Sequence, residues 1–215
     1  MTELAGQTAS PEYDAAAERL LASVESLRAD RPLVGTVIGI AGESGSGKTV
    51  TALSLARAIE RRGPRVLVLH QDDYFLRPPA TNHEHRRGDL TSVGPPEVRM
   101  PLLAEHIAAF RARRQVVAPR VDYPGNRFLT RQLDFSAIDV LLVEGTYVLL
   151  LPQLDVRVFL EATHEDTRAR RLTRARDIHE PFVDEVLRIE HAIIATQAGR
   201  ADIVIDREFR SARRV

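Results

Sequence analysis

The segment GESGSGKT, from Gly42 to Thr49, has the residue types and the spacing of a loop that binds phosphate groups. It fits the pattern G-x-x-x-x-G-K-[ST], whose glycines let backbone N–H groups point at phosphate oxygens. In that pattern the lysine, here Lys48, reaches the β- and γ-phosphates of a nucleotide, and the Thr49 hydroxyl binds Mg²⁺. The predicted nucleotide-binding residues are Gly42, Glu43, Ser44, Gly45, Ser46, Gly47, Lys48, Thr49 and Val50.

Carboxylates follow two apolar runs elsewhere in the chain. One run leads to Asp72 and Asp73, and another ends at Glu144. A buried strand end is a costly place for a carboxylate unless something there needs it. Because parallel strands end at one edge of a sheet, we expect Asp72 and Glu144 to lie beside the phosphate loop. Asp72 would then deprotonate an acceptor hydroxyl, Glu144 would hold Mg²⁺ together with Thr49, and Asp73 would serve the turn. The competing interpretation makes Asp72 a magnesium ligand.

A phosphate cradle, a magnesium site and a base are the parts that phosphoryl transfer needs. The sequence therefore predicts a kinase that uses ATP and Mg²⁺ and acts on a small-molecule phosphoryl acceptor. A GTPase-type switch is one alternative, because DYPG (residues 122–125) matches D-x-x-G, but the chain contains no N-K-x-D guanine reader. A non-catalytic nucleotide-binding subunit is the other, and the joint presence of Lys48, Thr49, Asp72 and Glu144 argues against it.

The elements that must position these residues alternate along the chain. Strands are expected at 32–42, 65–70, 139–145, 154–161 and 201–206, and helices at 11–29, 49–62, 97–114, 164–176 and 183–198. Residues 76–96 are rich in proline, glycine and charge and are expected to form an irregular loop. Apolar strands that alternate with helices predict the α/β class, a P-loop NTPase-type parallel sheet with helices on both faces.

Length and composition limit the function further. The 215 residues suit a single domain spanning 1–215, with 1–31 as an N-terminal helical extension. Thirty basic residues balance thirty acidic ones, so bulk charge favours neither nucleic acid nor anionic membranes as partners. The chain has no cysteine and no apolar signal segment at its start, from which we expect a cytoplasmic protein. The sequence does not decide the oligomeric state, and a homo-oligomer is compatible with it.

Five segments in order, GESGSGKT, HQDDYF, PRVDYP, DVLLVEG and RARD, resemble the uridine kinase and phosphoribulokinase family of P-loop kinases. The resemblance covers about residues 34–206. It implies that Asp72 is the catalytic aspartate and Glu144 the magnesium-associated glutamate. It also implies that Asp122 and Tyr123 line the acceptor pocket, within an acceptor region at 76–130.

The resemblance further implies a helical lid, rich in arginine, that covers the transferring phosphate. Here the lid would span 164–182, and Arg171, Arg174 and Arg176 would be its catalytic residues. Guanidinium groups match phosphate oxygens in shape and charge, which supports a clamp. A solvated basic helix is the alternative.

The acceptor side departs from the uridine kinase pattern. Pro181 and Phe182 stand where arginine and glycine are expected. An aspartate of the pattern is replaced by Gly94 or, with a shift, matched by Asp89, and a histidine becomes Asn126 or is lost. The basic segment NHEHRRGD (82–89) instead favours an anionic acceptor, such as a sugar phosphate or a pantothenate-like acid, as the alternative to a nucleoside or related metabolite. A metal site at its H-x-H pair lacks a third ligand nearby. The predicted acceptor-binding residues are Tyr74, Phe75, His83, Arg86, Asp122, Tyr123 and Arg127.

Overall fold

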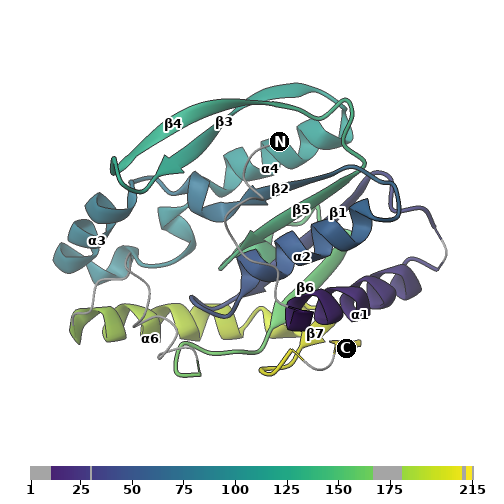
Figure 1. Ribbon diagram of the computed structural model, residues 1–215. Coiled ribbons are helices and arrows are strands. Elements are labelled where there is room, and N and C mark those ends of the chain that lie inside the picture. The colour runs from purple at the N-terminus through teal and green to yellow at the C-terminus, as the bar shows by residue number, and fades with distance from the viewer. Residues whose placement is uncertain (1–10, 30, 167–180, 210–211, 215) are drawn as a thin grey trace.

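The fold is built on one twisted sheet (Figure 1), seen in a computed structural model that describes residues 11–29, 31–166, 181–209 and 212–214. The sheet order is β2-β5-β1-β6-β7-β8, in which the first five strands are parallel and β8 is antiparallel to β7. The predicted parallel sheet is therefore confirmed. The strands are β1 (Thr36–Gly42), β2 (Val66–His70), β5 (Val140–Gly145), β6 (Val156–Leu160), β7 (Ile203–Ile205) and β8 (Ala212–Arg214).

Helices cover both faces of the sheet, because successive side chains of each buried strand point to opposite faces. Ile38 and Ile40 of β1 pack on one face with α1 (Pro11–Leu27) and α2 (Lys48–Glu60). Val37 and Ala41 pack on the other face with α4 (Met100–Arg111) and α6 (Pro181–Ala195). Every residue of β1 is buried, which accounts for the apolar sequence that follows Thr36. None of the described helices combines the length and the apolar character needed to cross a membrane.

A second, two-stranded sheet was not predicted. β3 (Gln115–Asp122) and β4 (Arg127–Asp134) form an antiparallel hairpin that arches over α4 (Figure 1). Much of the hairpin is exposed, and only a few side chains, such as Ala118 and Leu133, face the core. A half-exposed ribbon whose one short apolar run ends at Pro119 lacks the long apolar pattern that revealed the central strands.

The prediction of an irregular loop at 76–96 was wrong. The segment contains α3 (Pro79–Gly88) and the short 3₁₀ turn η2 (Leu90–Ser92), and it leads into η3 (Pro95–Glu97). Helix α3 has almost no apolar residues, so it shows no helical periodicity in the sequence. Its polar side chains hold it instead: Asn82 and Arg86 both donate to the buried carboxylate of Glu97. The remaining short turns are η1 (Gln71–Tyr74), η4 (Val148–Leu150) and η5 (Ala198–Arg200).

Part of the predicted lid falls outside the described residues. Positions 167–180 are among those that the structure does not describe, and they include Arg171, Arg174 and Arg176. The described flanks are a turn at 163–166 and the helix α6. The helical lid and the roles of its arginines therefore stay predictions.

Candidate active site

The predicted phosphate loop connects β1 to α2 at the carboxyl edge of the sheet. Gly47 has φ 94°, a left-handed conformation that glycine adopts without strain, and it directly precedes the first residue of α2. A Cβ atom on Gly42 would lie 2.8 Å from Ser46 Oγ and 3.0 Å from Leu160 Cβ, so a larger residue would push the loop apart. The two glycines thus allow a tight turn to feed directly into a helix.

The loop has the properties of an anion site. Helix α2 starts at Lys48, so its free N–H groups and the positive end of its dipole face the loop. Ser46 Oγ is buried and forms no hydrogen bond with any described residue. Lys48 Nζ donates to the Glu43 carbonyl oxygen at 2.8 Å, within the loop itself. These groups fit the phosphates of a nucleotide; Ser44 and Gly45 complete the turn, and Val50 lies in the first helical turn.

Glu144 lies beside the loop because of the strand order. Strand β5 is placed between β1 and β2, and the register brings Glu144 opposite both Ile40 and His70. Its Oε1 accepts a hydrogen bond from Thr49 Oγ1 at 3.1 Å and lies 2.7 Å from His70 Nδ1. Sequence reasoning missed His70, although the strand register alone would have paired it with Glu144.

The electrostatics of this pair favour an ionised carboxylate. Burial alone would raise the pKa of Glu144, but the hydrogen bond and charge of His70, with help from Lys48, lower it below the ordinary value. Burial likewise opposes the charge on His70, and the contact with Glu144 outweighs it and raises the pKa of His70. An ionised carboxylate oxygen 3.1 Å from a hydroxyl oxygen is a donor set that suits Mg²⁺, a cation that prefers oxygen ligands. Thr49 and Glu144 therefore fit the predicted metal site.

The neighbouring aspartates of η1 point in different directions. Asp72 is exposed, and its Oδ2 accepts a hydrogen bond from Tyr123 Oη at 2.9 Å. Asp73 is buried, and it accepts from Val121 N at 2.8 Å and lies 3.3 Å from the Arg131 guanidinium. Burial raises the pKa of Asp73, and the Val121 and Arg131 contacts oppose that shift. Asp73 thus holds the hairpin to η1, which is a larger role than the predicted turn contact.

Gln71 holds η1 in place, and sequence reasoning did not identify it. Its buried side chain accepts from Tyr147 N at 2.8 Å and donates to Thr146 Oγ1 at 3.0 Å. A Cβ atom on Gly145 would collide with the Gln71 side chain. The Glu-Gly pair at the end of β5 therefore combines the carboxylate of the predicted metal site with the space that η1 needs.

Two predicted acceptor residues make polar contacts inside the protein. Tyr74 is fully buried, and its hydroxyl lies 2.8 Å from His106 Nδ1 of α4. The Arg86 guanidinium pairs with Glu97 at 2.7 Å and with Glu190 of α6 at 2.8 Å. Both polar groups therefore have partners inside the protein, and the predicted role of the two residues as acceptor contacts stays a prediction.

The other predicted acceptor residues lie on the hairpin or on the surface of the same region. Asp122 pairs with Arg127 at 2.9 Å across the hairpin turn, where Gly125 N also donates to the Asp122 carboxylate. These bonds lower the pKa of Asp122. His83 packs edge-on against Phe182 with ring centres 4.9 Å apart. Phe75 is partly buried against the core. The DYPG segment is thus a hairpin turn whose Tyr123 reaches Asp72, and the sequence contains no N-K-x-D segment that could read guanine.

Residues 37–210 match the profile of the phosphoribulokinase / uridine kinase family. The chain belongs to this family. It is a phosphotransferase whose acceptor group is a hydroxyl, as membership of the family shows.

Individual members of the family differ in substrate. The chain is 27% identical over 194 residues to a uridine kinase of Staphylococcus aureus, covering 80% of this chain and 92% of that protein. It is 30% identical over 187 residues to a bifunctional alpha-galactosidase/sucrose kinase of Mediterraneibacter gnavus, covering 80% of this chain but only 20% of that longer protein. A solved structure from Bacillus stearothermophilus, titled a possible uridine kinase, aligns with a TM-score of 0.57 at 22% identity over 90% of this chain and 96% of that one. The last similarity concerns the fold alone.

Proposed function

We propose that this kinase transfers the γ-phosphate of ATP, with Mg²⁺, to a hydroxyl group of a neutral polyhydroxyl metabolite, either a nucleoside or a sugar. The observation that carries the proposal is the exposed carboxylate of Asp72, which accepts a hydrogen bond from the Tyr123 hydroxyl at 2.9 Å. Asp72 follows strand β2, which pairs with the strand that carries Glu144, the partner of Thr49. A base at that edge is placed for an acceptor that approaches the γ-phosphate from the hairpin side.

Each residue then has a defined task. Lys48 leaves the Glu43 carbonyl and binds the β/γ-phosphate oxygens. Thr49 and Glu144 would hold the cation, whose charge would offset that of the β- and γ-phosphates. Asp72 accepts the proton of the acceptor hydroxyl while the oxygen of that hydroxyl bonds to the γ-phosphorus. The bond between the γ-phosphorus and the bridging oxygen breaks, and that oxygen leaves with ADP. Arg171, Arg174 and Arg176 keep the clamp role that the family resemblance implies.

The pairing of three described arginines near the hairpin favours a neutral acceptor over an anionic one. Arg86 is committed to Glu97 and Glu190, Arg127 to Asp122, and Arg131 to Asp73. An anionic acceptor would have to compete with these carboxylates for the arginines, and its negative charge would lie close to theirs, which is unfavourable. The two curated relatives named above are a uridine kinase and a sucrose kinase, whose named acceptors are both uncharged.

A panel of acceptors tests the proposal through ADP formation with Mg²⁺–ATP. The neutral set is uridine, cytidine, nicotinamide riboside, ribose and sucrose, and the anionic set is pantothenate, ribose phosphate and ribulose phosphate. We expect kcat/KM to be higher for at least one neutral compound than for every anionic one. A preference for an anionic compound would select the alternative acceptor class. Acceptor-stimulated turnover with the Lys48→Ala variant equal to wild type would refute the proposed donor site.

A further inference from the structure

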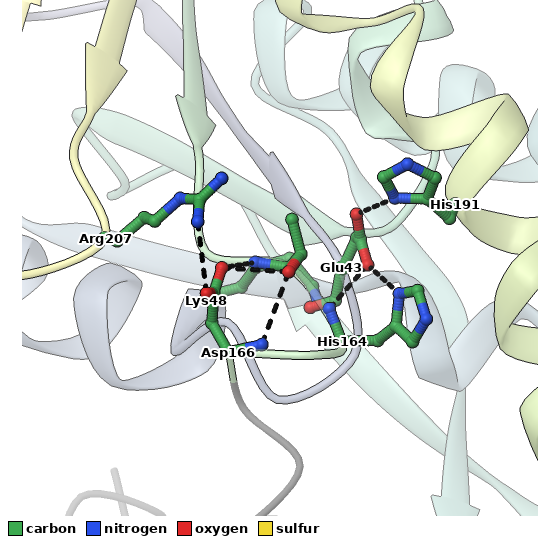
Figure 2. Close-up of polar contacts among 7 residues, drawn as sticks. Glu43, Lys48, His164, Asp166, His191 and Arg207 are labelled. Carbon is green, nitrogen blue, oxygen red and sulfur yellow. Dashed lines mark hydrogen bonds and ion pairs between the residues drawn. The ribbon is translucent and has the colours of Figure 1, made fainter.

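Three side chains from separate elements meet at the phosphate loop. Glu43 belongs to the loop after β1, His164 to the turn after β6, and His191 to α6 (Figure 2). His191 Nδ1 lies 2.6 Å from Glu43 Oε1, and His164 Nδ1 lies 2.8 Å from Glu43 Oε2. Each imidazole thus addresses a different oxygen of one carboxylate, and the proposed phosphoryl transfer uses none of these three side chains.

The cluster has the composition of a transition-metal site. Two imidazoles and one carboxylate form the His₂Glu donor set that binds Zn²⁺ in proteins and leaves one coordination position open. The three ligand atoms all lie within 4.8 Å of one another. Tetrahedral Zn²⁺ separates its ligand atoms by roughly 3.4 Å, so the Nδ1–Oε pairs at 2.6 and 2.8 Å would move apart by less than about 1 Å to admit the cation.

The surroundings prepare these ligands. The Glu43 side chain is 7% exposed, and the His164 backbone N–H also donates to Oε2 at 2.7 Å, which fixes the carboxylate from a second direction. Asp166 accepts from Thr163 N and Oγ1 and pairs with Arg207, so the turn that carries His164 is itself held (Figure 2). The His191 side chain is 43% exposed and offers a route from solvent.

We propose that Glu43, His164 and His191 form a binding site for a divalent transition-metal cation such as Zn²⁺, made of other residues than the Mg²⁺ pair Thr49 and Glu144. The cation replaces the two Nδ1–H···O contacts: each imidazole gives up its Nδ1 proton to solvent, takes one on Nε2 and binds the cation through Nδ1 as the neutral tautomer. Imidazole nitrogen favours Zn²⁺, Ni²⁺ and Cu²⁺, whereas Mg²⁺ favours oxygen, so the two sites differ in the metal they select. Occupancy ties the phosphate loop to α6 and to the turn at 163–166.

The test is calorimetric titration of the full chain with ZnCl₂, without an affinity tag and after removal of metal with a chelator. The buffer contains excess MgCl₂ and no nucleotide, so that the Thr49–Glu144 pair is offered its own cation. We expect one Zn²⁺ per chain. His164→Gln and His191→Gln should each weaken binding by more than about 10-fold. Both variants should fold, because each replaced side chain is partly exposed, and circular dichroism checks this.

His85→Gln is the matched control. It breaks the competing H-x-H pair of α3 and leaves the proposed ligands intact, so it should bind Zn²⁺ like the wild type.

Co²⁺ offers a second readout, because nitrogen ligation gives visible absorption bands that the His191→Gln variant should lose. At a free Zn²⁺ concentration of about 100 times Kd, the wild-type Tm should rise by about 5–10 °C. Wild-type protein that binds no Zn²⁺, or cluster variants that bind as tightly as wild type, would overturn the proposal.

Discussion

Asp72 and Asp73 are adjacent, and replacing each by asparagine should separate catalysis from stability. Asp72 is exposed and Asp73 is 5% exposed, yet both substitutions remove one carboxylate charge and keep the shape of the side chain. If Asp72 is the base, Asp72→Asn loses the group that accepts the proton. Turnover should fall by about 10²–10⁴-fold, which corresponds to roughly 3–5.5 kcal/mol of barrier.

The stability effects should run the other way. Asp72 contacts only an exposed tyrosine hydroxyl in the described structure, so Asp72→Asn should change the free energy of unfolding by less than about 0.5 kcal/mol. Asp73→Asn can still accept from Val121 N, but it places an amide beside the Arg131 guanidinium in a buried position. That loss should cost about 1–3 kcal/mol, or roughly 2–12 °C in Tm for a chain of this size.

Both variants are assayed for Tm, for ATP affinity and for turnover across a magnesium titration. We expect Asp72→Asn to be folded, to bind ATP normally and to be slow at every Mg²⁺ concentration. If raised Mg²⁺ restores part of its rate and its ATP affinity is weak, Asp72 is a magnesium ligand. A variant of Asp73 that is slow but as stable as wild type would refute the assignment of the two side chains.

Three further outcomes are expected. Lys48→Ala should lower turnover by at least about 100-fold without unfolding the chain, as measured by ADP formation and circular dichroism, because it removes the only cation within the loop. Gly145→Ala should lower stability by about 1–3 kcal/mol in denaturant titration, because its methyl group collides with buried Gln71. Burial raises the pKa of Glu190 against the opposing charge of Arg86. A protein with such an acid loses stability as the pH rises above 4.5, the ordinary pKa of the side chain, because folding then opposes its ionisation. Glu190→Gln should therefore flatten the fall of Tm with rising pH.

The donor half of the site could be predicted from sequence because topology fixes it. Glycines at set spacing and apolar runs identify a strand–loop–helix unit, and parallel strands end at one edge. Thr49 and Glu144 accordingly lie within hydrogen-bond distance of each other, beside the loop that carries Lys48. Helix and strand boundaries shifted by a few residues, as at β1, which begins at Thr36 rather than at residue 32.

The proposed acceptor half of the site was harder to predict from sequence, because it is built by polar contacts between segments that are distant in the chain. Helix α3 depends on Arg86 binding Glu97 and Glu190, residues 11 and 104 positions away. No periodic pattern within the helix encodes such partners, so its basic side chains suggested an anion site instead of an internal ion pair. The hairpin that brings Tyr123 to Asp72 was missed for a related reason, since its exposed strands lack the apolar signal of the central sheet.

Gln71 and Asp73 show how the acceptor half is tied to the donor half. Gln71 binds the chain directly after β5, whose Glu144 faces Thr49, and Asp73 binds the hairpin whose turn carries Tyr123. Asp72 lies between them, so neighbours on both sides fix its backbone while its own side chain stays exposed. A general base requires this combination, because its position must be held by groups other than the carboxylate that accepts the proton.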